Sequence, residues 1–354
     1  MQWKNAVTDV FGIEYPIVQA PMLGVTTPEM VAAISNGGAL GSLPVGGLPP
    51  DKTGELIRKT RTLTGKPFAV NLFTYEYHEA TTAGIDEMQA FLRSFCQDKN
   101  IPYNIKENYS FPSYSYKDQV KVLLEENVSI VSFTFGIPDD ESLHLMKSKG
   151  VILVGTATSG EEAKVLESKG IDVVVAQGIE AGGHRGSFLA GEVLPMVGTM
   201  ALVPQIAKIV NLPVLAAGGI TSGNTIKGAF SLRASGVQVG TAFIPSVESA
   251  TSAFHKQRTL DARETDTVLT RALSGRWARG FSTLLIRTIE NSGLEIPGYP
   301  VQLDLAAQIR AYGQQQHNVD LVPLWAGQGG AAAKEILSAA AILDLLIQQT
   351  EAIE

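Results

Sequence analysis

The chain has 354 residues and a net charge of −7, with 45% hydrophobic and 18% charged residues. Its basic residues are scattered, which argues against a nucleic-acid groove or a polybasic membrane patch. No uninterrupted apolar run reaches the roughly 18 residues that span a bilayer. The N-terminal MQWKNAVTDVFG lacks the basic and apolar regions of a signal peptide. We therefore expect a cytoplasmic protein with no nucleic-acid or membrane partner, and leave homo-oligomerisation open.

Short apolar segments alternate with amphipathic stretches along the chain. Most of the apolar segments are continuous rather than alternating, as expected for parallel strands covered on both faces. Stretches such as SGEEAKVLESKG begin with a capping residue and end at glycine. This pattern indicates that helices lie between the apolar segments. This pattern predicts an α/β fold, a TIM-type (β/α)8 barrel, with strands within 15–22, 39–47, 67–73, 128–136, 151–158, 173–183, 213–220 and 236–244.

An open doubly wound sheet is the alternative architecture. Its usual G-x-G-x-x-G turn after the first strand is absent, because that strand ends in QAPMLGV. We predict a barrel over residues 1–244, interrupted by an insertion at 74–120. Residues 245–325 are expected to form a smaller, mainly helical substrate lobe, and residues 326–354 to end in a closing helix packed on the barrel.

Polar residues and glycines collect where the predicted strands end, which is where barrels of this kind place their chemistry. Glycine in a strand often marks close approach by a ligand. AAGGI and VQVGTAF end the last two strands, at the usual phosphate site of such barrels. The residues concerned are Gln19, Pro21, Met22, Asn71, Gln177, Glu180, His184, Gly218, Gly219, Gly240 and Thr241.

The ligand that these strand ends favour is a flat cofactor carrying a monophosphate. The chain has no Walker G-x-x-x-x-G-K-[ST] motif, which disfavours a nucleoside triphosphate. The amides of Asn71 and Gln177 can both donate to and accept from a ring such as the flavin pyrimidine. Each could instead be a satisfied buried amide, and the glycines could simply turn the chain.

The sequence allows three roles for His184. It could be a core histidine bonded to a loop carbonyl, or a metal ligand with Glu180, although one His and one Glu fall short of a metal site. A catalytic acid–base or hydrogen-bond donor is the preferred reading, because its pKa range suits proton transfer near neutrality and the flanking glycines admit a substrate. Since the chain has one cysteine, Cys96, which we take for a passive helix residue, no multi-cysteine metal site is available and none is predicted.

The segments YPIVQAPMLGV, VVVAQGIEAGGHRG, LAAGGI and GVQVGTAF together closely resemble the class I nitronate monooxygenases, also called the 2-nitropropane dioxygenase family. The resemblance covers essentially the whole chain. VVVAQGxEAGGH with QAPM is its specific part, whereas AAGGI and VGTAF occur in many FMN-binding barrels. It implies non-covalently bound FMN and oxidation of alkyl nitronates by O2 to a carbonyl compound and nitrite. Propionate 3-nitronate is the usual family substrate, and detoxification the implied purpose.

Matched residue by residue, the resemblance implies a set of site residues. His184 is the active-site histidine of the motif, with the role of hydrogen-bonding the nitro group and of general base if a neutral nitroalkane is used. Several relatives carry a second histidine where this chain has Thr134, and Tyr299 is a candidate aromatic wall. The implied FMN contacts are Met22, Asn71, Gln177, Gly182 and Gly219, with Gln238, Val239, Gly240 and Thr241 at the phosphate.

Three rival functions remain open. An NAD(P)H-dependent flavin enoyl-ACP reductase has a similar glycine-rich motif ending in His. A barrel that has lost its chemistry could serve as a flavin-binding scaffold, although Asn71, Gln177 and His184 argue against it. A metal-dependent aldolase or isomerase is more distant, since carboxylates are scarce at the strand ends.

Overall fold

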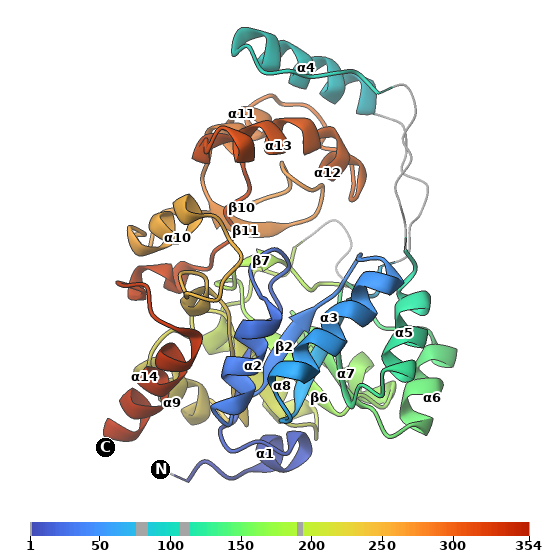
Figure 1. The fold of residues 1–354 in the computed structure, drawn as a ribbon, viewed down its shortest axis with the longest axis vertical. Coiled ribbons are helices and arrows are strands. Elements are labelled where there is room, and N and C mark those ends of the chain that lie inside the picture. The colour runs from blue at the N-terminus through green and yellow to red at the C-terminus, as the bar shows by residue number, and fades with distance from the viewer. Residues whose placement is uncertain (1, 76–83, 107–113, 190–193, 354) are drawn as a thin grey trace.

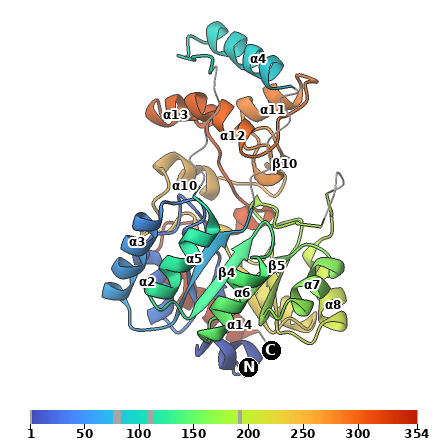
Figure 2. The ribbon, with the colours of Figure 1, turned by 90° about the vertical axis from the view of Figure 1, so that its right-hand side faces the viewer.

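The computed structural model describes residues 2–75, 84–106, 114–189 and 194–353, and its centre is a barrel of eight parallel strands (Figures 1 and 2). The strands follow the order β1-β9-β8-β6-β5-β4-β3-β2. A parallel bridge between Val18 and Leu40 joins the two edge strands. The predicted TIM-type barrel is thereby confirmed. Its strands are β1 (Ile17–Gln19), β2 (Gly41–Pro44), β3 (Phe68–Phe73), β4 (Ile130–Thr134), β5 (Ile152–Ala157), β6 (Val173–Gln177), β8 (Val214–Ala217) and β9 (Gly236–Val239).

Both faces of the strands are buried, which explains their continuous apolar sequence. The barrel interior is filled by side chains such as Val154, Val175 and Leu215, and α1 (Ala6–Phe11) adds Val7 and Phe11 to the same cluster. Each apolar side chain buried in this way contributes about 1.5–3 kcal/mol to folding. Figures 1 and 2 show α1 at the end of the barrel opposite the carboxyl ends of the strands. Packing therefore closes this end, and the opposite end is left for a site.

Helices cover the outside of the barrel. Several begin at a residue whose side chain accepts from a backbone N–H of the first turn, including Thr27, Asp139, Ser159 and Ser222. No helix in the described ranges is long and apolar enough to cross a membrane. The outer helices are α2 (Pro28–Asn36), α3 (Pro50–Leu63), α5 (Tyr116–Glu125), α6 (Asp140–Ser148), α7 (Gly160–Ser168), α8 (Thr199–Ile209), α9 (Gly223–Ser231) and α14 (Ala339–Ala352).

A second body of structure, which we call the upper lobe, lies above the carboxyl ends of the strands (Figures 1 and 2). Helix α4 (Ile85–Asp98) shares one apolar cluster with residues 272–321, so segments far apart in sequence form a common core. Cys96 is buried in this cluster, and burial raises the pKa of its thiol to about 11. The other elements of the lobe are α10 (Ala253–Leu260), β10 (Thr267–Thr270), β11 (Ala278–Phe281), α11 (Leu284–Glu290), α12 (Val301–Leu305) and α13 (Ala307–Gln315). Short 3-10 turns lie at Thr241–Phe243, Val319–Leu321 and Gln328–Ala332.

The lobe and the barrel are joined by a small antiparallel sheet that the sequence did not indicate. Its strand order is β10-β11-β7, where β7 is the two-residue strand Gly183–His184. His184 is opposite Ala278 of β11, and Gly183 is opposite Arg279. The strand expected over 173–183 is therefore divided: β6 ends at Gln177, and the chain turns before it pairs with the lobe.

Candidate active site

The amide side chains predicted to bind a ligand lie at the carboxyl end of the barrel. Nδ2 of Asn71 donates to the hydroxyl of Ser132 at 3.0 Å and to that of Thr134 at 3.4 Å. Thr134 thus helps to orient Asn71. Gln19 is fully buried and accepts from the N–H of Ser42 at 3.1 Å, so it holds neighbouring strands together.

The segment after β6 is held by its own side chains. The Gln177 amide donates from Nε2 to the His184 carbonyl at 3.1 Å and accepts at Oε1 from the Gly186 N–H at 2.8 Å. The buried Arg185 guanidinium donates to the carbonyls of Gly178, at 2.6 Å, and Gln177, at 2.9 Å. These bonds fix the loop from Gln177 to Gly186 in one conformation and thereby fix the backbone of His184.

Two of the motif residues have packing roles in this loop. A Cβ on Gly182 would collide with the backbone of Ala326 and Gly327, so the chain passes too closely for any larger residue. The Glu180 carboxylate accepts from the backbone N–H and the hydroxyl of Thr199, at 2.9 Å each, at the first turn of α8. Glu180 therefore caps a helix. Among the described residues, no group of three His, Cys, Asp or Glu side chains could hold a metal ion.

The ends of β8 and β9 have the features of an anion cradle. Gly219 has a φ of +73°, and a Cβ there would meet nothing closer than 3.8 Å. A Cβ on Gly240 would lie 3.6 Å from the Met22 sulfur, which places the first strand end beside the last. The N–H groups of Gly219, Gly240 and Thr241 donate to no acceptor among the described residues. Unpaired N–H groups beside unobstructed backbone suit a phosphate.

The other residues of the predicted phosphate segment have defined partners. The Val239 carbonyl accepts from the Ala20 N–H at 2.8 Å, and the half-buried Gln238 is opposite Val18 in the β1–β9 ladder. The Thr241 hydroxyl accepts from the Gly327 N–H at 2.9 Å. The barrel ladder thus continues to the edge of the cradle, which keeps its N–H groups in place.

His184 lies in an aromatic environment beneath the upper lobe. Its ring is centred 5.4 Å from that of Trp325, 5.5 Å from that of Phe135 and 6.3 Å from that of Tyr299. Its Nε2 atom lies 2.9 Å from the Ser274 hydroxyl oxygen. Burial lowers the pKa of His184 to about 4, with further contributions from two guanidinium groups, Arg276 and Arg310. The imidazole is therefore neutral near pH 7.

Tyr299, the candidate aromatic wall, lies near His184, with ring centroids 6.3 Å apart. Its ring packs edge-on against that of Tyr75, with centroids 4.9 Å apart, and lies 6.1 Å from that of Phe135. Burial raises the pKa of its hydroxyl, while nearby guanidinium groups oppose that rise. Tyr299 is thus a neutral phenol facing the same region as His184.

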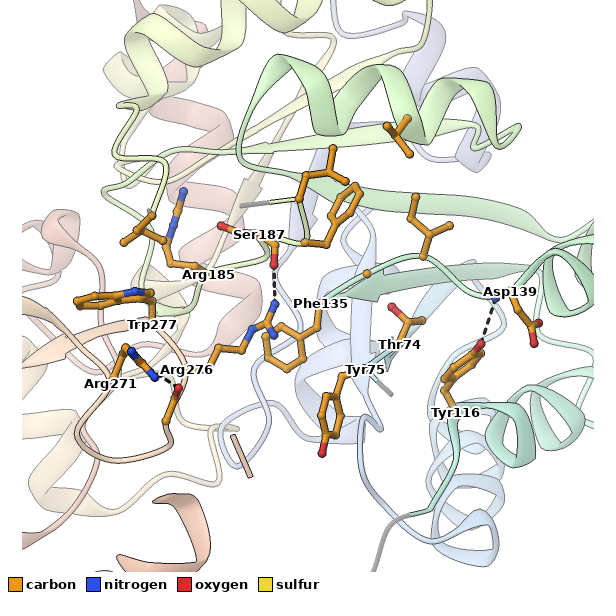
Figure 3. Close-up of a pocket in the computed structure, with 17 residues that line it drawn as sticks. Thr74, Tyr75, Tyr116, Phe135, Asp139, Arg185, Ser187, Arg271, Arg276 and Trp277 are labelled. Atoms are coloured by element: carbon orange, nitrogen blue, oxygen red, sulfur yellow. Dashed lines mark hydrogen bonds between the residues drawn. The ribbon is translucent and has the colours of Figure 1, made fainter. Parts of the chain in front are cut away.

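Sequence reasoning missed the arginines of this region. A cavity of about 970 Å³ is lined in part by Arg276 and Phe135, and the ring of Phe135 is centred 5.5 Å from that of His184 (Figure 3). The Arg276 guanidinium donates to the Ser187 carbonyl, and its Cζ lies 4.2 Å from the centre of the Phe135 ring. The signal that could have found it is RALSGRWARG, residues 271–280, where three arginines stand within one short segment. Arg310 offered no such signal, because it stands alone within a helix.

Residues 4–349 match the sequence model of the family described as nitronate monooxygenase. A probable nitronate monooxygenase of Staphylococcus saprophyticus is 39% identical over 100% of this chain and 99% of its own length. Another, from Staphylococcus aureus strain Newman, is 40% identical over 92% of this chain and 91% of its own.

Two solved structures are similar over nearly the whole chain. The nitroalkane oxidase of Streptomyces ansochromogenes superposes with a TM-score of 0.90 at 32% identity, covering 98% of each chain. FabK from Thermotoga maritima has a TM-score of 0.78 at 29% identity, covering 98% of this chain and 96% of its own. With the family match across residues 4–349, these similarities show that the chain is an enzyme of the nitronate monooxygenase family, a group of flavin-dependent oxidoreductases that oxidise nitronates.

Proposed function

We propose that the enzyme uses FMN and O2 to oxidise alkyl nitronates to a carbonyl compound and nitrite, with propionate 3-nitronate as the candidate substrate and detoxification as the purpose. The observation that carries this proposal is the environment of His184. The imidazole is neutral, bordered by three aromatic rings and close to two guanidinium groups. Such a site favours a small planar anion and does not itself carry a competing negative charge.

The described residues fit FMN. The free N–H groups of Gly219, Gly240 and Thr241 offer a cradle for one phosphate group. Asn71 and Met22 lie at strand ends where they would border the flavin ring. Gln177 and Gly182 also stabilise the loop after β6. The loop structure therefore accounts for a glutamine and a glycine at these positions, in addition to the proposed flavin contacts. The proposed FMN set is Met22, Asn71, Gln177, Gly182, Gly219, Gln238, Val239, Gly240 and Thr241.

When bound, the flavin supplies one-electron chemistry between a nitronate and O2. The nitronate is already a carbanion equivalent, so the protein does not need a strong base. His184 would hydrogen-bond a nitro oxygen, the guanidinium groups would offset its negative charge, and the aromatic rings would exclude water. For a neutral nitroalkane, His184 would instead accept the α proton.

Oxygen consumption by the purified flavoprotein tests the proposal directly. Propionate 3-nitronate is added without NADH or NADPH, and nitrite is measured in the same sample. Uptake accompanied by nitrite is the expected result. Flavin-loaded enzyme that consumes no oxygen would overturn the proposal. Chromatography of the flavin released by heat identifies it as FMN or as another flavin.

The second candidate is the NAD(P)H-dependent enoyl-ACP reductase, which the glycine-rich motif left open. The similarity to FabK gives it some support. The nitroalkane oxidase structure superposes better, however, with a TM-score of 0.90 against 0.78 for FabK. Consumption of NADH or NADPH with an enoyl thioester, and no oxygen uptake with nitronate, would favour this candidate.

A further inference from the structure

Phe135 belongs both to the surroundings of His184 and to the lining of the cavity of about 970 Å³. Its ring meets that of His184 edge to face, with centroids 5.5 Å apart. It lines the cavity together with Arg276, whose guanidinium lies against the same ring (Figure 3). Among the described residues, the cavity lining does not include His184, nor Tyr299 and Trp325, which border it. The site around His184 and the cavity are therefore two spaces that adjoin at the Phe135 ring.

The Phe135 ring is held in this position from several sides. The Cζ atom of Arg276 lies 4.2 Å from the ring centre, and Arg276 is itself anchored by its hydrogen bond to the Ser187 carbonyl. The ring of Phe73 packs against it with centroids 4.6 Å apart. Phe135 directly follows β4 and has a φ of +78°, a left-handed conformation that bulky side chains rarely adopt. Such a residue persists only where its surroundings enforce it, and strained residues of this kind gather at functional sites.

The cavity is larger than a short-chain nitronate needs, and much of its wall is apolar. Volumes of about 300–1,000 Å³ suit drug-sized ligands. The charged side chains of the lining have partners within the protein: Arg185 and Arg271 donate to backbone carbonyls, and Asp139 is paired with Lys117. Of the residues that the structure describes, none in the proposed FMN set lines the cavity. The apolar side chains of the lining include Ile137, Val165, Phe188, Leu189, Leu194 and Trp277.

We propose that Phe135 is a specificity-determining residue, whose ring closes the site around His184 against the cavity and thereby limits the length of the alkyl chain on the nitronate. A chain that extends from a nitro group at His184 past the position of this ring enters the cavity, where burial of its methylenes is favourable. With the ring in place this path is blocked, and a long chain gains no such contact. This inference rests on the proposed function, because it concerns the substrate of that same site.

Two substrates that differ in chain length test the proposal, the nitronates of nitroethane and of 1-nitrooctane. In Phe135→Ala, the ratio of kcat/KM for the longer substrate over the shorter should rise by at least about tenfold, because several methylenes become buried. Phe254→Ala removes a half-buried ring from α10, outside the cavity lining, and should leave the ratio unchanged. If Phe135→Ala does not fold, Phe135→Gly also removes the ring and accepts the positive φ. An unchanged or lower ratio in the folded variant would overturn the proposal.

A second substitution shows whether the longer chain occupies the cavity. Val165 is half-buried on α7 and lines the cavity, so a phenylalanine there takes up part of the cavity volume. When Val165→Phe is combined with Phe135→Ala, most of the gain in the ratio should be lost. A gain that persists in the double variant would overturn the proposal, because the chain would then lie elsewhere.

A binding measurement separates this proposal from the proposed function. Calorimetry in the absence of oxygen gives the dissociation constants of neutral nitroethane and 1-nitrooctane with the flavoprotein, and it requires no turnover. Relative to the wild type, Phe135→Ala should bind 1-nitrooctane at least about tenfold more tightly compared with nitroethane. This result without turnover of any nitronate would reject the proposed function alone. Turnover of nitronates by both proteins, with no change in relative binding, would overturn the role of Phe135 alone.

Discussion

The Nε2 atom of His184 lies 2.9 Å from the hydroxyl oxygen of Ser274, and the same hydroxyl lies 3.1 Å from the carbonyl oxygen of Arg276. A hydroxyl has one proton to donate. When that proton goes to the carbonyl, Nε2 of His184 must carry a proton and Nδ1 is free to accept one. When the hydroxyl turns to Nε2, Nδ1 carries the proton and can donate to a nitro oxygen. Ser274 can therefore support both roles assigned to His184.

Replacing Ser274 with alanine removes this control of the tautomer. We expect kcat/KM for nitronates to fall by about two- to tenfold, which corresponds to one neutral hydrogen bond, with flavin content unchanged. Steady-state oxygen uptake and the visible flavin spectrum measure the two quantities. A variant with wild-type kinetics would show that the bond has no part in turnover.

His184→Asn should lower nitronate turnover sharply, by at least about tenfold, because a positioned acid–base or hydrogen-bonding side chain is lost. Flavin should stay bound, since the proposed cradle is formed by other strand ends. Near-normal turnover would remove His184 from the mechanism. Loss of flavin together with activity would indicate a structural role in place of a chemical one.

The lowered pKa of His184 predicts the pH dependence of catalysis. Because burial lowers this pKa from 6.5 to about 4, the imidazole stays neutral as the pH falls from 8 to 5. We expect the kcat/KM profile with a preformed nitronate to show no ionisation near 6.5 from this residue. Comparison of this profile with that of His184→Asn identifies the contribution of His184 to the pH dependence. A wild-type inflection near 6.5 that disappears in the variant would contradict the lowered pKa.

The buried histidine His255 predicts how the stability of the fold depends on pH. His255 bonds the Thr251 hydroxyl at 2.8 Å and the Trp325 carbonyl at 3.2 Å, and burial lowers its pKa to about 4 as well. Between about pH 4 and pH 6.5 the unfolded chain is protonated at His255 and the folded chain is not. The stability is therefore fully present above pH 6.5 and is lost as the pH falls towards 4, by an amount on the order of 3 kcal/mol for His255. Urea unfolding at pH 7.5 and 5 should show this loss, and His255→Gln should reduce it.

Two glycines should respond differently to alanine. A Cβ on Gly182 would collide with the backbone of Ala326 and Gly327, so Gly182→Ala should lower the unfolding temperature. A Cβ on Gly240 would meet the Ala20 Cβ at 3.4 Å and the Met22 sulfur at 3.6 Å, which the fold can accommodate. Gly240→Ala should therefore stay folded but retain less flavin if the phosphate binds there. Thermal unfolding and flavin content separate the outcomes. Full flavin occupancy in folded Gly240→Ala would place the phosphate elsewhere.

The sequence predicted the barrel well because most strands are continuous apolar runs that are buried on both faces. It could not predict that the strand over 173–183 is divided, since β7 has two residues and no pattern of its own. The shared core of α4 and residues 272–321 depends on contacts across almost 200 positions. Arg310 was missed because it stands alone within a helix, and its electrostatic effect on His184 depends on the three-dimensional structure.

The ladder between β7 and β11 gives the upper lobe a part in setting up the chemistry. His184 follows a barrel strand in sequence, yet its backbone pairs with Ala278 and its ring nitrogen with Ser274. Any tilt of the lobe relative to the barrel would move the imidazole along with it. Exchanging lobes between related enzymes would consequently change the orientation of the His184 imidazole together with the walls of the substrate site.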